Sequence, residues 1–380
     1  FTIIKVLKII EITNFYKDFL IPNSGYNLVK IESGRFYLLT KGKELAQAVK
    51  DSVDEEIRSL MLECITEGGL SEEEITRLLP LGLNAINPNS SEWIFLNNLL
   101  TKEDSNGLTL RRETVYLMLT ACESEVPISN FVTHIFLEYK QLRRSIPAAF
   151  GWYFYYLCEA LHYGIESIFC YVLDCIDKFQ NPPVSVLLDN AVDDLVMLLN
   201  DEQQYKSIDE WIKDYHAEIE WQLSEVKRLV KGQDYAKSVI ESLKLFWLLY
   251  QEFQQNQTAI MDFEQKYDLV RQRGILSEGL KDYVERYVSL PIRTYLEKVL
   301  RQVMNEHTFV AIKKMGNSYL DLRKFILENG CAILVEMRYP NETNPRIESL
   351  HNFLVDLGYL KIDNTTTPIA KKFLSEYGKE

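Results

Sequence analysis

The chain has 380 residues, of which 47% are hydrophobic and 26% are charged. This composition excludes an intrinsically disordered chain, and the length allows two or three domains, each with its own core. A net charge of −13 excludes a protein that coats nucleic acid along its whole surface, but it leaves room for a local basic face. Because glycine and proline are scarce, the composition predicts a mostly α fold.

Charge is unevenly distributed along the chain. Residues 51–75 carry nine acidic side chains and one basic side chain, Arg58. Residues 271–324 carry eleven lysines and arginines against six acids, a local balance of +5. Any contact with phosphate is therefore predicted towards the C-terminal third.

The cysteine pattern and the most apolar run both bear on location. Six cysteines occur singly in apolar stretches without a Cys-x-x-Cys pair, which is typical of reduced thiols and predicts a cytoplasmic protein. Residues 150–173 are apolar enough to raise the question of a membrane span. Glu159, His162 and Glu166 interrupt that run, and each is costly in hydrocarbon. We therefore expect a buried core helix and no membrane contact.

The first 50 residues alternate helical and strand-like pieces. Apolar residues recur at helical spacing up to Pro22, and a turn at 23–25 precedes a further helical or extended stretch. A turn at Gly34 leads into a strand, "RFYLL", and a helix follows from about Glu44. The expected order is helix, turn, helix, strand, helix, with the first helix cut off.

Residues 51–306 read as a helical bundle. Ser71 followed by Glu74 predicts a capping box, and Pro80 ends that helix. Helices at 148–200 are apolar on nearly every face, as expected at the centre of a bundle. Those at 207–305 are longer and more polar. The helices at 207–273 fit either an antiparallel coiled-coil-like arm or the outer layer of the bundle.

From residue 307 the pattern changes again. The stretch that begins "HTFVAIKKM" and continues through "YLDLRKFILENG" predicts a helix and a turn, and "CAILVEM" predicts a strand. A helix "RIESLHNFLVDLG" follows, with Gly358 at its C′ position. A short strand "YLKI" then reverses at 363–364 before the last helix.

Two stretches resemble the wing of winged-helix proteins. "LLTKGKEL" at 38–45 matches in Leu39, Thr40 and Gly42, with the glycine one residue early. "TTTPIAKKFL" near the C-terminus matches less well, with Ala370 where a glycine is usual. The resemblance implies a partial winged-helix-like module at 1–50, a helical scaffold at 51–306 and a second winged-helix-like module at 307–380.

A wing places backbone and basic side chains beside phosphates, although winged helices also serve as docking modules for proteins. Both uses stay open here. The residues that we expect to contact DNA or a partner are all basic: Lys30, Arg35, Lys41, Lys43, Arg346, Lys361, Lys371 and Lys372.

The strongest metal-like pattern in the chain is weak. Glu159, His162 and Glu166 would share one helix face, and Glu-x-x-His is half of a di-iron carboxylate motif. The alternative is a set of satisfied polar groups in a core. No phosphate-binding loop or nucleophile elbow occurs in the sequence, and we expect no cofactor.

These observations predict a non-enzymatic scaffold subunit of a prokaryotic complex that processes DNA or defends against foreign DNA. The expected partners are protein subunits of a larger complex, with double-stranded DNA as a further candidate. The architecture also resembles kleisin-type subunits, which would imply a bridge to an SMC-type ATPase. A metal-dependent nuclease or a di-iron bundle is the alternative from a different class.

Overall fold

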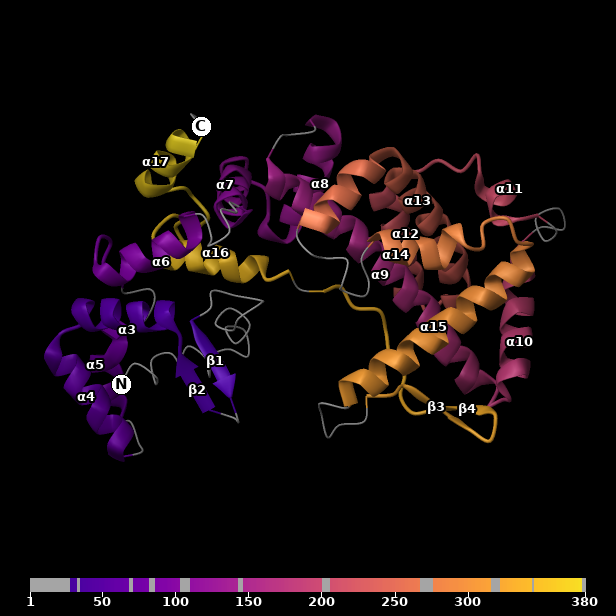
Figure 1. The fold of residues 1–380 in the computed structure, drawn as a ribbon, viewed down its shortest axis with the longest axis horizontal. Helices are drawn as coiled ribbons and strands as arrows, with labels where there is room; N and C mark the ends of the chain where they lie inside the picture. The colour runs from indigo at the N-terminus through magenta and orange to yellow at the C-terminus, as the bar shows by residue number, and fades with distance from the viewer. Residues whose placement is uncertain are drawn as a thin grey trace. The chain divides into compact units, whose positions relative to one another are not determined.

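The computed structural model divides the chain into two compact units, residues 1–150 with 345–380 and residues 151–344. Helix predominates in both, so the predicted mostly α class is confirmed (Figure 1). The residues that the structure describes are 28–32, 35–67, 71–81, 86–102, 110–142, 146–199, 206–266, 276–315, 322–343 and 345–377. The helix and turn predicted within 1–27 lie outside these residues.

The first unit combines one hairpin with short helices from both ends of the chain. Helix α3 packs on α6, α6 packs on α7, and α17 also packs on α7. Its elements are β1 (Val29–Glu32), β2 (Arg35–Leu38), α3 (Thr40–Ser52), α4 (Glu55–Glu67), α5 (Glu72–Leu78), η1 (Leu79–Leu81), α6 (Ser91–Thr101), α7 (Leu110–Glu123), η3 (Ile128–Asn130), α8 (Phe131–Leu142), α16 (Ile347–Asp356) and α17 (Pro368–Tyr377).

Local signals set several helix ends in this unit. The predicted capping box of α5 is confirmed: the Ser71 hydroxyl accepts from the backbone N–H of Glu74, whose carboxylate accepts from the backbone N–H of Ser71. Gly358 follows α16 with φ of 75°, the left-handed conformation that a C′ residue needs. Buried Glu113 of α7 accepts a hydrogen bond from the backbone N–H of Ala148, at 2.7 Å.

The second unit is built around long helices. It contains α9 (Pro147–Lys178) from Gly151 onward, α10 (Val184–Val196), α11 (Ile208–Ile212), α12 (Ile219–Lys231), α13 (Tyr235–Lys266), α14 (Leu276–Leu280), a π-helical turn η5 (Lys281–Glu285), α15 (Ile292–Met315), β3 (Phe325–Glu328) and β4 (Cys331–Leu334).

Helix α9 is the predicted core helix. Its fully buried side chains include Leu157 and Ile168, and the hydroxyl of buried Ser167 bonds to that of Ser238 on α13 at 2.9 Å. A Cβ at Gly164 would lie closer than 3.0 Å to the ring of Phe246, so the glycine lets α13 approach closely. None of the described helices combines the length and apolarity that a membrane crossing requires.

Helices α12 and α13 form an antiparallel pair joined by a short turn at 232–234. Val239, Phe246 and Leu249 of α13 are fully buried. This burial fits a layer of the bundle better than a coiled-coil-like arm. Helix α13 kinks at Asn256, whose φ of −116° is not helical. The Asn256 side chain donates to the carbonyl of Glu252, one turn earlier, at 3.0 Å.

Three local predictions near the C-terminus and at α3 were wrong. In the stretch that was expected to hold only a helix and a turn before "CAILVEM", the structure has β3, which pairs antiparallel with β4 across a turn at Asn329 and Gly330, with φ of 51° and 79°. Two positive φ values define a type I′ turn, for which Asn-Gly is the preferred pair. "YLKI" forms only an isolated bridge between Leu360 and Thr366. Helix α3 begins at Thr40 rather than near Glu44.

The predicted module boundaries do not coincide with the limits of the two units. Residue 50 lies inside α3 and residue 306 lies inside α15. The residues of the expected C-terminal module are divided, since β3 and β4 belong to the second unit and α16 and α17 to the first. The winged-helix assignment of the ends stays a prediction.

Candidate functional site

All eight basic residues that the sequence predicts as contacts lie in the first unit. Four of them belong to β1, β2 and α3. Lys30 lies over the ring of Tyr37 on the adjacent strand, 5.5 Å from its centroid. Arg35 is the first residue of β2, opposite Glu32 in the register. Lys41 and Lys43 fall in the first turn of α3, which has no acidic residue and no side-chain N-cap. Such a helix start favours an anion.

A close backbone contact joins this hairpin to α3 (Figure 1). The backbone N–H of Leu39 donates to the carbonyl of Leu28 at 2.9 Å. A Cβ on Gly42 would fall closer than 3.0 Å to that same carbonyl oxygen. Gly42 is therefore the residue that lets the start of α3 sit against the strand.

The outward face of α3 carries a polar row, of which the sequence prediction singled out Lys43 alone. Lys43, Gln47 and Lys50 are all exposed. Their spacing of four and three residues places them on one face of the helix. Asp51 accepts a hydrogen bond from Gln47 at 2.7 Å, and Glu44 is exposed on the same helix. The helical spacing was visible in the sequence, but the burial of Leu45 and Val49, which makes this face the outer one, was not.

The other four predicted residues flank or lie on the two C-terminal helices. Arg346 precedes α16 in a left-handed conformation, with φ of 59°. Lys361 is exposed in the turn before α17, where its N–H donates to the carbonyl of Thr365. Lys371 and Lys372 are exposed on α17.

Helix α6 holds this C-terminal segment. The indole N–H of Trp93 donates to the carbonyl of Leu357 at 2.9 Å, and the hydroxyl of Tyr359 donates to the side-chain carbonyl of Asn97 at 2.5 Å. Since α3 also packs on α6, one helix contacts both regions in which basic contacts were predicted.

Aromatic contacts add a second attachment at α7. Tyr116 stacks on Tyr377 of α17, with ring centroids 4.3 Å apart. The guanidinium of Arg112 lies 5.2 Å from the same Tyr377 ring, a cation–π contact. The end of α17 is thereby fixed on α7.

The acid-rich stretch at 51–75 begins at the end of α3 and continues through α4 into α5 of the same unit. Two of its carboxylates form ion pairs: Glu55 with Arg58, and Glu56 with Arg77, which lies just beyond the stretch, at 2.8 Å. Exposed Glu72 and Glu73 at the start of α5 add further negative charge to this unit. Attraction of phosphate is therefore confined to the lysine-bearing parts of the surface.

The weak metal candidates on α9 have other partners. The Glu159 carboxylate accepts from the backbone N–H of Thr343 at 2.9 Å. Oε1 of Glu166 pairs with Arg338 at 2.5 Å and lies 3.7 Å from Nε2 of His162. The other oxygen of Glu166 accepts from the backbone N–H of Asn341 at 3.3 Å. In the part of the chain that the structure describes, no three His, Cys, Asp or Glu side chains are placed to hold a metal ion.

The basic excess at 271–324 is partly neutralised within the second unit. Lys298, Lys313 and Lys314 of α15 are exposed. Four other cations of this segment pair with carboxylates, namely Arg286 with Asp282, Arg293 with Asp193, Arg301 with Glu297, and Lys324 with Glu336.

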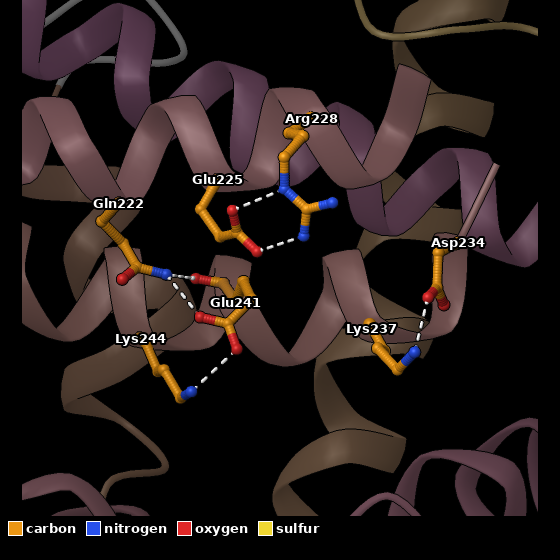
Figure 2. A network of polar contacts seen from close by, with 7 residues as sticks. All are labelled: Gln222, Glu225, Arg228, Asp234, Lys237, Glu241 and Lys244. Carbon is orange, nitrogen blue, oxygen red and sulfur yellow. Dashed lines mark hydrogen bonds and ion pairs between the residues drawn. The ribbon is translucent and has the colours of Figure 1, made fainter. Parts of the chain in front are cut away.

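The pair α12 and α13 carries a network of polar contacts that sequence reasoning did not foresee (Figure 2). Buried Gln222 of α12 donates to both the backbone carbonyl and the carboxylate of Glu241 on α13, at 2.9 and 2.8 Å. Glu241 in turn pairs with Lys244 at 2.7 Å. Each polar group is satisfied by a neighbour, so the network fixes the register of the two helices.

Comparison with known proteins identifies no relative: no protein-family model, no curated protein and no solved structure matches the chain.

Proposed function

We propose that the chain is a non-enzymatic scaffold subunit of a complex that processes DNA, and that the first unit binds duplex DNA through β1, β2 and α3. The observation that carries the proposal is the exposed row of Lys43, Gln47 and Lys50 on α3. This row lies on the helix whose start is fixed against the hairpin by Gly42. A helix with lysines and an amide on one face can contact phosphates and base edges.

The charges on this surface set the expected strength of binding. Lys41, Lys43 and Lys50 are opposed on α3 by Glu44 and Asp51. With two or three phosphate contacts, binding is weak, and the affinity falls by about 10-fold to 40-fold between 50 and 200 mM salt. Such weak contact suits a subunit that gains affinity from its partners.

The test measures binding of a labelled duplex of about 30 base pairs by fluorescence anisotropy, at 50 and 200 mM NaCl. We expect the wild type to bind at the lower salt concentration. The variant Lys43→Glu/Lys50→Glu is expected to lose at least tenfold in affinity and most of the salt dependence. Absence of binding, or binding that neither salt nor the variant changes, contradicts the proposal.

A charge-matched control separates this surface from general electrostatics. Lys298→Glu/Lys313→Glu makes the same charge change on exposed positions of α15 in the second unit. We expect this control to bind the duplex within about twofold of the wild type. An equal loss in both variants would show that the net charge of the chain, rather than the α3 surface, governs binding.

A second candidate function, docking of a protein, is favoured by helix α5. No residue of α5 is buried, Ile75 is 50% exposed, and Leu79 directly after the helix is 63% exposed. Glu72 and Glu73 lie beside these apolar side chains, so a partner with a basic amphipathic helix would complement the surface. Ile75→Ser/Leu79→Ser should abolish co-purification of such a partner and leave binding of the duplex unchanged.

A further inference from the structure

The segment 335–343, called the strap here, has no helix or strand and is held along one face of α9. The hydroxyl of Tyr155 lies 2.7 Å from that of Thr343, and the Glu159 carboxylate accepts from the Thr343 N–H. Further along the helix, Glu166 accepts from the guanidinium of Arg338 at 2.5 Å. The strap therefore runs antiparallel to α9.

The receiving residues belong to one helix face because of their spacing. Tyr155, Glu159 and Glu166 are separated by four and seven residues, which correspond to one and two helical turns. Their partners are of two kinds. Glu159 and Glu166 accept from backbone N–H groups, those of Thr343 at 2.9 Å and Asn341 at 3.3 Å, which any residue except proline could offer. Only Arg338 adds a charged side chain to the α9 contacts.

Polar contacts, rather than burial of apolar surface, hold the strap. Pro340 is its one buried residue, while Val335 and Tyr339 are 50% and 51% exposed. Arg338 is 39% exposed, so its ion pair with Glu166 is accessible to water and salt. A second ion pair joins Glu342 to Lys227 of α12. Segments with so little apolar burial open far more readily than the core beneath them.

The helix beneath the strap has its own support. Leu157 and Ile168 are completely buried in the second unit, and Ser167 bonds to Ser238 of α13. The face that carries Glu159 and Glu166 would therefore keep its form when the strap leaves. Two carboxylates would then lack the N–H donors that they now bind, which is unfavourable unless water or another chain replaces them.

We propose that this acidic face of α9 is a binding site for an extended peptide segment that carries an arginine, and that the strap occupies the site in the resting chain. A partner segment binds there by displacing the strap. The two carboxylates accept hydrogen bonds from its backbone N–H groups, and one oxygen of Glu166 accepts a charge-assisted hydrogen bond from its arginine, as it now does from Arg338. This site lies in the second unit and does not depend on the proposed contact with DNA.

Because the strap is covalently attached, it competes at an effective concentration of about a millimolar. A free peptide of the same sequence must therefore bind the wild type poorly and bind better when the strap is weakened. The probe is a labelled synthetic peptide, VEMRYPNET, which copies residues 335–343. Arg338→Glu places a carboxylate against Glu166 and weakens the strap without altering the site.

The first measurement is hydrogen exchange at 50 mM NaCl, which reports whether the strap is released. Arg338→Glu should raise exchange of the amides of 341–343 at least tenfold and leave the amides of α13 between Val239 and Leu249 protected. Arg301→Glu, which breaks the exposed pair with Glu297 on α15, is the matched control and should leave the strap protected. If Arg338→Glu unfolds the unit, Arg338→Gln removes the ion pair without adding repulsion.

The second measurement is binding of the peptide by fluorescence anisotropy. We expect at least tenfold tighter binding by Arg338→Glu than by the wild type or by Arg301→Glu. Adding Glu159→Gln/Glu166→Gln to Arg338→Glu should abolish that gain, and 300 mM NaCl should reduce it. The proposal is overturned if the strap stays protected in the Arg338 variants, or if it is released and the peptide gains no affinity.

Discussion

The two hairpins of this chain have the same size but different attachments. In each, two strands of four residues are joined by two residues, with Glu32 opposite Arg35 in one and Glu328 opposite Cys331 in the other. The first hairpin meets α3 through the Leu28 carbonyl, which accepts from Leu39. The second hairpin is hydrogen-bonded to the start of α10 and to the residues just before it.

Two backbone hydrogen bonds attach the second hairpin to residues 182–184. The Gly330 carbonyl accepts from the N–H of Val184 at 3.0 Å, and the N–H of Ala332 donates to the carbonyl of Pro182 at 2.9 Å. Ala332 is fully buried and Phe325 nearly so. An edge that is already paired in this way cannot present a wing to DNA. A strand, a turn and a second strand in the sequence therefore do not distinguish a wing from an element of the core.

The largest expected effect tests the attachment of the first hairpin. Gly42→Ala would drive a methyl group into the Leu28 carbonyl oxygen, which is backbone and cannot rotate away. We expect a loss of about 3 kcal/mol in the free energy of unfolding, or roughly 6 to 12 °C in the melting temperature of the first unit. Thermal unfolding followed by circular dichroism measures it.

The matched variant in the second hairpin is Gly330→Ala. No atom lies within 4 Å of the added Cβ there, so only the positive φ of 79° opposes the substitution, at a cost of about 1 kcal/mol. Equal losses in the two variants would show that α3 yields to the methyl group. The close contact with Leu28 would then not be what positions the hairpin.

The second prediction uses a histidine beside the second hairpin. The ring of His307 on α15 stacks on Phe169, with centroids 4.3 Å apart, and its Nε2 accepts from the backbone N–H of Lys324 at 3.0 Å. That bond requires a neutral ring. The pKa of His307 is lowered to about 4, chiefly by burial and to a smaller extent by the nearby cations Arg338, Lys324 and Lys314.

The sign of the pH dependence follows from this shift. The unfolded chain takes up a proton at His307 near pH 6.5, while the folded chain resists protonation until about pH 4. The contribution of this group to stability is therefore intact above pH 6.5, is lost as the pH falls to about 4, and changes little below that. At pH 5 the loss amounts to about 1 to 2 kcal/mol.

Hydrogen exchange at pH 7 and 5, corrected for intrinsic rates, can measure this loss in both hairpins of one sample. We expect protection of β3 and β4 to decrease at pH 5, and protection of β1 and β2, which contain no histidine, to change less. His307→Gln should remove the difference between the two pH values. The charged neighbours Lys324 and Arg338 pair with Glu336 and Glu166, so high salt serves as a control for those pairs.

The sequence was most informative where a signal is local. The Ser71 capping box, the Gly358 helix end and the long buried helix α9 were all foreseen, because each depends on residues close together in the chain. The strand β3 was not foreseen. "FILENG" also fits the apolar spacing of a helix, and the decision between the two came from the Asn329 and Gly330 turn and from pairing with β4.

The candidate sites show the same limit at longer range. Lysines that could face DNA were chosen by type, but which helix face is exposed depends on packing between α3 and α6. Glu159 and Glu166 were paired with His162 because helical spacing was the one relation that the sequence offered. Their partners, Thr343 and Arg338, lie more than 170 residues away. Such contacts follow from the fold and have no local signature.

The smallest expected effect concerns the segment that completes the first unit. Trp93→Phe keeps an aromatic ring on α6 but removes the indole donor to the Leu357 carbonyl, so we expect a loss of about 1 kcal/mol. If α6 holds the C-terminal segment as the structure shows, hydrogen exchange at 353–360 should rise while β1 and β2 stay protected. An independently folded C-terminal module would retain its protection in this variant.

Tyr359→Phe, which removes the neighbouring bond to Asn97, should act in the same direction. If the losses in the free energy of unfolding add up in the double variant, the two hydrogen bonds act separately. A combined loss smaller than the sum would mean that the two bonds depend on each other in fixing the segment.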